Sequence, residues 1–160
     1  INIIRRFREK YGVEVYLEPG EAVGWQTGFL ISSVLDIVHN EKDIAILDTS
    51  AEAHMPDTVL MPYRPAVRGE SENGKFAYRF GGNTCLAGDI MGLEAGDAEY
   101  KFDSELKIGD RVIFEDQIHY TIVKNTTFNG IKLPDLLLLK ENGEIKMIRE
   151  LGYEEYRRRN

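Results

Sequence analysis

The sequence predicts a mainly β protein, an antiparallel β-barrel or sandwich with a short helix at each end. Two observations carry this prediction. Segments rich in apolar and β-branched residues recur along the chain, and turn signals separate them at a spacing of about ten residues. The two ends instead carry charged stretches with helical periodicity. At 160 residues the chain is long enough for one domain with a sizeable core.

The N-terminal third predicts one helix and three strands. Residues 1–12 form an amphipathic pattern that stops at Gly12, a residue suited to the left-handed end of a helix. Residues 13–20 alternate in polarity and end in a Pro-Gly turn, which predicts a strand. Residues 22–40 predict one long strand, bent at Gly24 or Gly28. Residues 44–50 predict the next, paired with the long strand as an antiparallel hairpin.

The remaining segments alternate between loops and strands. Residues 51–67 contain three prolines within ten positions, so we expect an ordered loop there and neither a regular helix nor a central strand. The other expected elements are a strand at 75–82, a turn at 84–92, a turn and strand at 105–116, a strand running into a loop at 119–130, a hairpin at 134–151 that turns at Asn142-Gly143, and a terminal helix at 152–160.

Charge and cysteine content exclude several classes of function. A formal net charge of −7 argues against binding to a nucleic-acid backbone. The single cysteine rules out an internal disulfide and a cysteine-based zinc site, and it fits a reducing, cytoplasmic setting. No run of about 20 apolar residues predicts a membrane span. The chain starts within a helix pattern and without Met, so we expect it to be part of a longer protein.

The candidate site residues lie in short motifs that each have an ordinary structural interpretation as well. Cys85 stands in "FGGNTCLAGD", where glycines allow a sharp bend or a close approach. It is either a small buried residue in a tight turn or a thiol that donates a proton or attacks a substrate. Glu18 precedes a Pro-Gly turn and Asp57 lies on a proline-rich loop, where both could also be ordinary surface acids. Tyr120 and Phe128 could simply be core or rim aromatics. No spacing predicts a metal site.

The order of these motifs resembles the C-terminal half of the fold-type III pyridoxal-phosphate-dependent decarboxylases, which include ornithine and diaminopimelate decarboxylases. The motifs are "EPG", "AHMPD…MPYRP", "GGNTCLAGD" and "LKIGDRVIFEDQIHYTIVKNTTFNG". Their wording is similar to the carboxynorspermidine and carboxyspermidine decarboxylases within that superfamily. The resemblance implies a β-barrel domain that follows a (β/α)8 barrel. Residues 1–20 would be the last elements of that missing barrel, 21–150 the β-barrel domain and 151–160 a terminal helix.

The resemblance also implies roles for single residues. Glu18 would face the pyridine nitrogen of pyridoxal 5'-phosphate, and Tyr120 would contact the cofactor. Cys85 would donate a proton to the α-carbon of the substrate, and Phe128 would line the pocket. The lysine that forms the Schiff base is not in this chain. Because the cysteine loop of the superfamily reaches into the neighbouring subunit, a homodimer with shared active sites is implied.

Departures from the family pattern point to the substrate. Glu21 stands where many relatives have Arg, and a carboxylate there suits a substrate with an additional cationic amine. Asp57 is a second candidate for binding an amine, and Asp89 a third substrate-binding candidate or a structural residue. Leu86, where ornithine decarboxylase has Asp, argues against ornithine. We therefore expect decarboxylation of a carboxypolyamine. The alternatives are a diaminopimelate or other basic-amino-acid decarboxylase, and a non-catalytic β-barrel binding or regulatory module.

Overall fold

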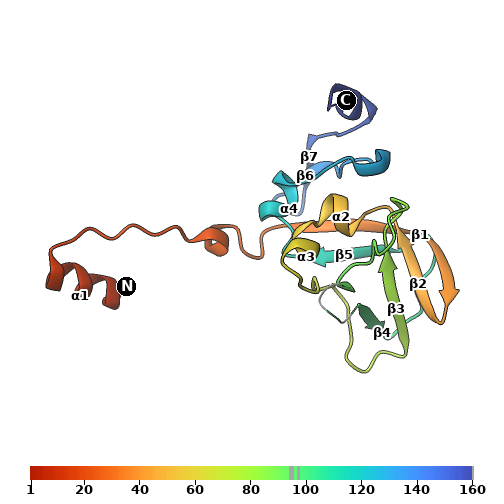
Figure 1. Cartoon of the computed structure of the whole chain (residues 1–160), viewed down its shortest axis with the longest axis horizontal. Coiled ribbons are helices and arrows are strands. Elements are labelled where there is room, and N and C mark those ends of the chain that lie inside the picture. Colours follow the sequence, from red (N-terminus) through yellow and green to blue (C-terminus); the bar gives the residue numbers. More distant parts are fainter. Residues whose placement is uncertain (94–95, 97, 160) are drawn as a thin grey trace.

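A five-stranded sheet is the main feature of the computed structural model, which describes residues 1–93, 96 and 98–159 (Figure 1). The strand order across the sheet is β4-β3-β2-β1-β5. All neighbouring strands are antiparallel except β2 and β3, which run parallel. The fold is therefore mainly β, as the sequence predicts. The strands are β1 (Phe29–Asn40), β2 (Lys42–Leu47), β3 (Phe76–Gly81), β4 (Glu99–Phe102) and β5 (Arg111–Glu115).

The long strand β1 pairs with a different neighbour along each half. Residues 29–33 pair with β5, and the strand from Val34 onward pairs with β2. A register shift between Val34 and Asp36 lies where the strand changes from one neighbour to the other. Such a bulge bends a strand and increases its twist. The expected bend at Gly24 or Gly28 is wrong, since both residues precede the strand. The hairpin to β2 is confirmed, and it turns at Glu41, whose φ is +59°.

Aromatic side chains in the core show that the sheet curls. Phe80 of β3 packs against Phe114 of β5, with ring centroids 5.8 Å apart. Two strands, β2 and β1, lie between β3 and β5 in the sheet, so this contact requires a strongly curved sheet. Phe80 also packs against Tyr100 of β4 at 4.7 Å. Apolar burial of these rings gives the curled sheet a single core.

Short elements precede, connect and follow the strands of the sheet. These are a 3-10 turn η1 (Gly20–Val23), the helices α2 (Ala51–His54), α3 (Asp57–Leu60) and α4 (His119–Val123), the 3-10 turn η3 (Phe128–Gly130), the strands β6 (Leu136–Leu139) and β7 (Ile145–Arg149), and the C-terminal α5 (Tyr153–Arg159). The β6–β7 hairpin and the terminal helix are confirmed. Among the described residues, no helix is both long and apolar enough to span a bilayer.

Two expected elements are wrong for identifiable reasons. Residues 119–123 form α4 and not a strand, although they are rich in β-branched residues, and His119 at the start of the helix lies 3.2 Å from the Glu21 carbonyl oxygen of η1. Residues 51–67 contain two single-turn helices although they are rich in proline. Ser50 caps α2 by accepting a hydrogen bond from the backbone N–H of Ala53 at 3.1 Å. Pro56 directly precedes α3, a position where a helix needs no N–H from it.

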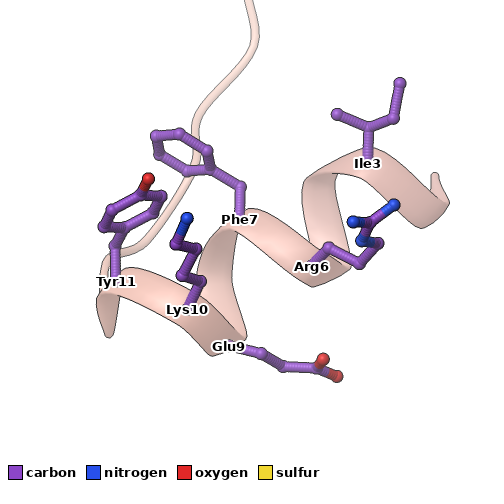
Figure 2. A pocket seen from close by; sticks show the side chains of 6 residues that line it. All are labelled: Ile3, Arg6, Phe7, Glu9, Lys10 and Tyr11. Carbon is purple, nitrogen blue, oxygen red and sulfur yellow. The ribbon is translucent and has the colours of Figure 1, made fainter.

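The N-terminal helix stands apart from the sheet. The helix α1 (Asn2–Tyr11) ends at Gly12 with φ +63°, as expected, and buries none of its residues. The strand expected at 13–20 is wrong, because residues 13–19 have no strand partner among the described residues. A cavity of about 640 Å³ lies along α1, and all six of its lining residues come from this one helix (Figure 2). It contains none of the candidate site residues.

Candidate functional site

Cys85 lies at the tip of a loop that leaves β3 and returns to pair with it. The backbone N–H of Gly82 donates to the Asp89 carbonyl at 2.8 Å, and a bridge joins Gly81 to Ile90. Cys85 is exposed and has a φ of +62°, the left-handed region that few non-glycine residues adopt. A side chain at Gly82 would place its Cβ 2.1 Å from Asp89 Oδ2. The glycine therefore permits the close approach that presents the thiol.

Asp89 is a buried anchor of this loop, with 5% of its surface exposed. Its Oδ1 accepts hydrogen bonds from Ser50 Oγ at 3.0 Å and from the backbone N–H of Ala51 at 2.8 Å. Its Oδ2 accepts from Thr84 Oγ1 at 2.5 Å. These bonds tie the cysteine loop to the start of α2. The geometry therefore places Asp89 in a structural position, and a substrate-binding role for it stays a prediction.

Phe128 reaches the cysteine loop through its neighbour Asn129. Asn129 Nδ2 donates to the Thr84 carbonyl oxygen at 2.7 Å, and the backbone N–H of Thr126 donates to the Ala53 carbonyl at 2.9 Å. Phe128 remains 39% exposed on η3. The "TTFNG" motif thus lies between α2 and the loop that carries Cys85, where an exposed ring can form a pocket wall.

Tyr120 and Asp57 are joined by Lys124, which the sequence analysis did not select. Lys124 Nζ forms an ion pair with Asp57 Oδ1 at 2.6 Å and lies 4.6 Å from the centre of the Tyr120 ring. Tyr120 is 56% exposed, whereas Asp57 is only 9% exposed. The ion pair holds α4 against α3. The Asp57 carboxylate is thus already paired with an ammonium group, that of Lys124, in a position where an ammonium group fits.

Glu18 and Glu21 flank the start of η1, next to α4. The backbone carbonyl of Glu21 lies 3.2 Å from His119 Nε2. Gly24 makes this packing possible, since a Cβ there would lie 2.9 Å from the same nitrogen. The side chains of Glu18 and Glu21 are both exposed. The "EPG" motif therefore lies beside the helix that carries Tyr120.

Tyr63, on the proline-rich loop, is 38% exposed and accepts a hydrogen bond from Gln117. Partial burial raises the pKa of Tyr63, and a hydrogen bond from Gln117 at 3.3 Å opposes the shift. The negative charges of Asp57, Asp116 and Glu21 raise it further. Tyr63 carries no local signal in the sequence, because its partner Gln117 lies 54 positions away in the chain.

His54 is the buried base of α2, directly behind the cysteine loop. Its Nδ1 accepts a hydrogen bond from the backbone N–H of Ser50 at 3.2 Å, and only 1% of the residue is exposed. Burial lowers the pKa of His54 to about 4, although the Lys132 backbone and the charge of Asp89 favour the protonated form. His54 is therefore neutral at physiological pH.

A family model matches residues 18–117, which include all five strands of the curled sheet. The model describes the C-terminal sheet domain of the pyridoxal-dependent decarboxylases. The chain belongs to this family. Its motifs for Glu18, Asp57 and Cys85 all lie within the matched region, and those for Tyr120 and Phe128 follow it.

Relatives extend the likeness to the whole chain. A carboxynorspermidine/carboxyspermidine decarboxylase from Campylobacter jejuni subsp. jejuni is 57% identical over 100% of this chain and 44% of its own length. A carboxyaminopropylagmatine decarboxylase from Synechocystis sp. is 47% identical over 99% of this chain and 41% of its own length. The crystal structure of carboxynorspermidine decarboxylase from Campylobacter jejuni, complexed with norspermidine, has a TM-score of 0.89 and covers 99% of this chain and 45% of its own. The chain thus spans less than half the length of these relatives.

The residues of this decarboxylase domain fit pyridoxal 5'-phosphate, the cofactor that membership of the family implies. The cofactor presents a basic ring nitrogen and an anionic phosphate. Glu18 has an exposed carboxylate, the kind of group that would pair with a protonated ring nitrogen, and Tyr120 has an exposed phenol that can donate a hydrogen bond. Cys85 supplies an exposed thiol. These donor and acceptor groups have the chemistry that the cofactor and its reaction require.

Proposed function

We propose that this chain is the C-terminal sheet domain of an enzyme that decarboxylates carboxynorspermidine and carboxyspermidine to norspermidine and spermidine. The observation that carries the substrate class is the ammonium group of Lys124, which pairs with the Asp57 carboxylate at 2.6 Å and lies 4.6 Å from the centre of the Tyr120 ring. Carboxylates beside an aromatic ring favour a cationic ligand, and both substrates are polyamines. They differ by one methylene, which a pocket distinguishes by only ~1–3 kcal/mol, so we propose both.

Each residue has one task in this reaction. The cofactor supplies the electron sink that makes loss of CO2 possible. The Glu18 carboxylate keeps a proton on the ring nitrogen, and Tyr120 orients the cofactor through its hydroxyl. Cys85 donates a proton to the α-carbon after CO2 has left. Phe128 excludes water from the reacting atoms.

Substrate amines are bound by the acidic residues. Glu21 and Asp57 accept hydrogen bonds from the ammonium groups, and a substrate ammonium competes with Lys124 for the Asp57 carboxylate. The Schiff-base lysine belongs to the barrel domain outside this chain. We also infer a cytoplasmic homodimer whose active sites are shared between subunits.

The test is an absorbance titration with pyridoxal phosphate, performed on this chain alone and on the full-length enzyme. We expect the visible band of bound cofactor in the full-length enzyme only, followed by CO2 release from carboxynorspermidine. The absence of this band from both proteins would overturn the proposal and favour a non-catalytic binding module.

Decarboxylation of diaminopimelate is the second candidate function, and the same assay measures it with diaminopimelate as substrate. A diaminopimelate decarboxylase from Buchnera aphidicola is 26% identical over 89% of this chain. Diaminopimelate carries a second carboxylate, which Glu21 would repel and an arginine would bind. We therefore expect a much lower kcat/KM for diaminopimelate than for carboxynorspermidine. The opposite order would assign the enzyme to the diaminopimelate branch.

A further inference from the structure

Thr84, the residue before Cys85, is held from two sides. Its hydroxyl donates to Asp89 Oδ2 at 2.5 Å, and its carbonyl oxygen accepts from Asn129 Nδ2 at 2.7 Å. Only 2% of Thr84 is exposed. One bond therefore fixes the side chain and the other fixes the backbone of the same residue.

The bond to the backbone acts directly on the cysteine. The Thr84 carbonyl belongs to the peptide unit that contains the Cys85 nitrogen, and this unit is planar. The hydrogen bond from Asn129 thus fixes the orientation of the peptide plane between Thr84 and Cys85. Cys85 then continues at φ +62°, a conformation that persists in non-glycine residues only where the surroundings enforce it.

Both holding residues are themselves anchored to α2. Asp89 accepts hydrogen bonds from Ser50 Oγ and the Ala51 N–H at the start of this helix. The segment before Asn129 is tied to the Ala53 carbonyl by Thr126. The two hydrogen bonds that hold Thr84 therefore both connect it to α2, so the positions of Asp89 and Asn129 are fixed relative to the same helix.

We propose that Asn129 and Asp89 are positioning residues that orient the Cys85 thiol for proton donation. This inference rests on the proposed function, because it assigns a purpose to the cysteine loop of that decarboxylase. Neither residue touches the reacting atoms. Each acts through Thr84, Asp89 on its hydroxyl and Asn129 on its carbonyl.

The experiment compares three variants of the full-length enzyme. Thr84→Val removes the hydroxyl while keeping the shape of the side chain, and Thr84→Ser retains the hydroxyl as the matched control. Asn129→Gly removes the amide, and because Asn129 has a φ of +53° glycine adds no backbone strain there. We measure kcat and KM separately. We also follow the alkylation of Cys85 by iodoacetamide, using mass spectrometry of tryptic peptide 80–101, well below the temperature of unfolding.

We expect Thr84→Val and Asn129→Gly each to lower kcat by about tenfold or more while KM changes by less than about twofold, because misplacement of a reacting group affects the chemical step. The alkylation rate of Cys85 should change severalfold in both, since the exposed thiol loses its fixed orientation. Thr84→Ser should stay within about twofold of the wild type in all three quantities.

Wild-type kcat and alkylation in both Thr84→Val and Asn129→Gly would overturn the positioning role. Equal losses in Thr84→Ser and Thr84→Val would also overturn it, since they would point to packing of the methyl group instead. Failure of the proposed function gives a different result. In that case the wild-type enzyme releases no CO2 from carboxypolyamines, while the alkylation rates still decide whether the two residues hold the cysteine.

Discussion

At the scale of single residues, the site combines an exposed thiol with a buried base behind it. Cys85 is exposed on its loop, whereas His54 is enclosed beneath the same loop. The two differ in what they contribute. Because the thiol is exposed, its loss should affect the chemistry. Because the imidazole is buried, its titration should affect stability.

Replacing Cys85 with Ala should impair the reaction and leave cofactor binding intact. A general acid contributes about 10²–10⁴-fold to a rate, so we expect kcat for product formation to fall by that factor. The visible band of bound pyridoxal phosphate should remain, because Cys85 does not hold the cofactor in the proposed site. Stopped assays of product amine and absorbance spectra measure both effects. Normal turnover in Cys85→Ala would remove the general-acid role.

Stability should decrease as the pH is lowered from about 6.5 to 4. Unfolded His54 takes up a proton below about pH 6.5, whereas burial keeps the folded residue neutral until about pH 4. The unfolded state therefore binds more protons in this window, and the free energy of unfolding should fall by about 3 kcal/mol across it. Urea denaturation of the chain at several pH values measures the loss.

The variant His54→Asn tests the assignment, since the Asn oxygen can replace Nδ1 as acceptor for the Ser50 N–H. It should flatten the pH dependence between 6.5 and 4, whatever its absolute stability. His39→Asn, at an exposed position of the β1–β2 hairpin, is the matched control and should retain the slope. An unchanged slope in His54→Asn would assign the acid sensitivity to other groups.

At the scale of elements, the cysteine loop depends on a close contact between its two ends. Gly82 leaves β3 directly against the Asp89 carboxylate, so no side chain fits between them. The same carboxylate holds α2 and Thr84. One added methyl group should therefore disturb the loop and its anchor together.

Gly82→Ala should lower the free energy of unfolding by about 2 kcal/mol, because it displaces a buried carboxylate from its hydrogen bonds. Gly152→Ala is the matched control, since its Cβ would meet no atom within 4 Å, and it should change stability by less than about 0.5 kcal/mol. Urea denaturation of each variant provides the comparison. Equal stabilities of the two variants would contradict the tight packing around Asp89.

At the scale of the whole molecule, the proposed dimer shares its active sites. The residues that contact the cofactor and the cysteine that protonates the substrate are expected to come from different subunits. A domain with much exposed apolar surface suits such a role. The β6–β7 hairpin exposes Leu137, Leu139 and Ile145, and α1 exposes Ile3 and Phe7.

Mixing two inactive variants of the full-length enzyme should restore activity. In a heterodimer of Glu18→Ala and Cys85→Ala subunits, one of the two shared sites has both wild-type residues. Random association makes half of the dimers heterodimers, so we expect about a quarter of wild-type activity after the variants are unfolded and refolded together. Each variant refolded alone is the control. No recovery in the mixture would place Glu18 and Cys85 in the same subunit.

The sequence by itself determined the elements whose signals are local. Gly12 ends α1 because it adopts the left-handed conformation, and Asn142-Gly143 turns the β6–β7 hairpin. The family was also predictable, since its motifs follow one another along the chain. Cys85 could be selected from the sequence because it is the single cysteine and glycines stand on both sides of it, at 81, 82 and 88.

Only the tertiary structure decided which distant segments meet. Residues 119–123 have the composition of a strand, yet they form α4, whose first residue packs beside η1. Lys124 and Asn129 carry no local signal, because their partners Asp57 and Thr84 are 67 and 45 positions away in the chain. Such contacts depend on the curvature of the sheet, and curvature arises from the packing of side chains across several strands.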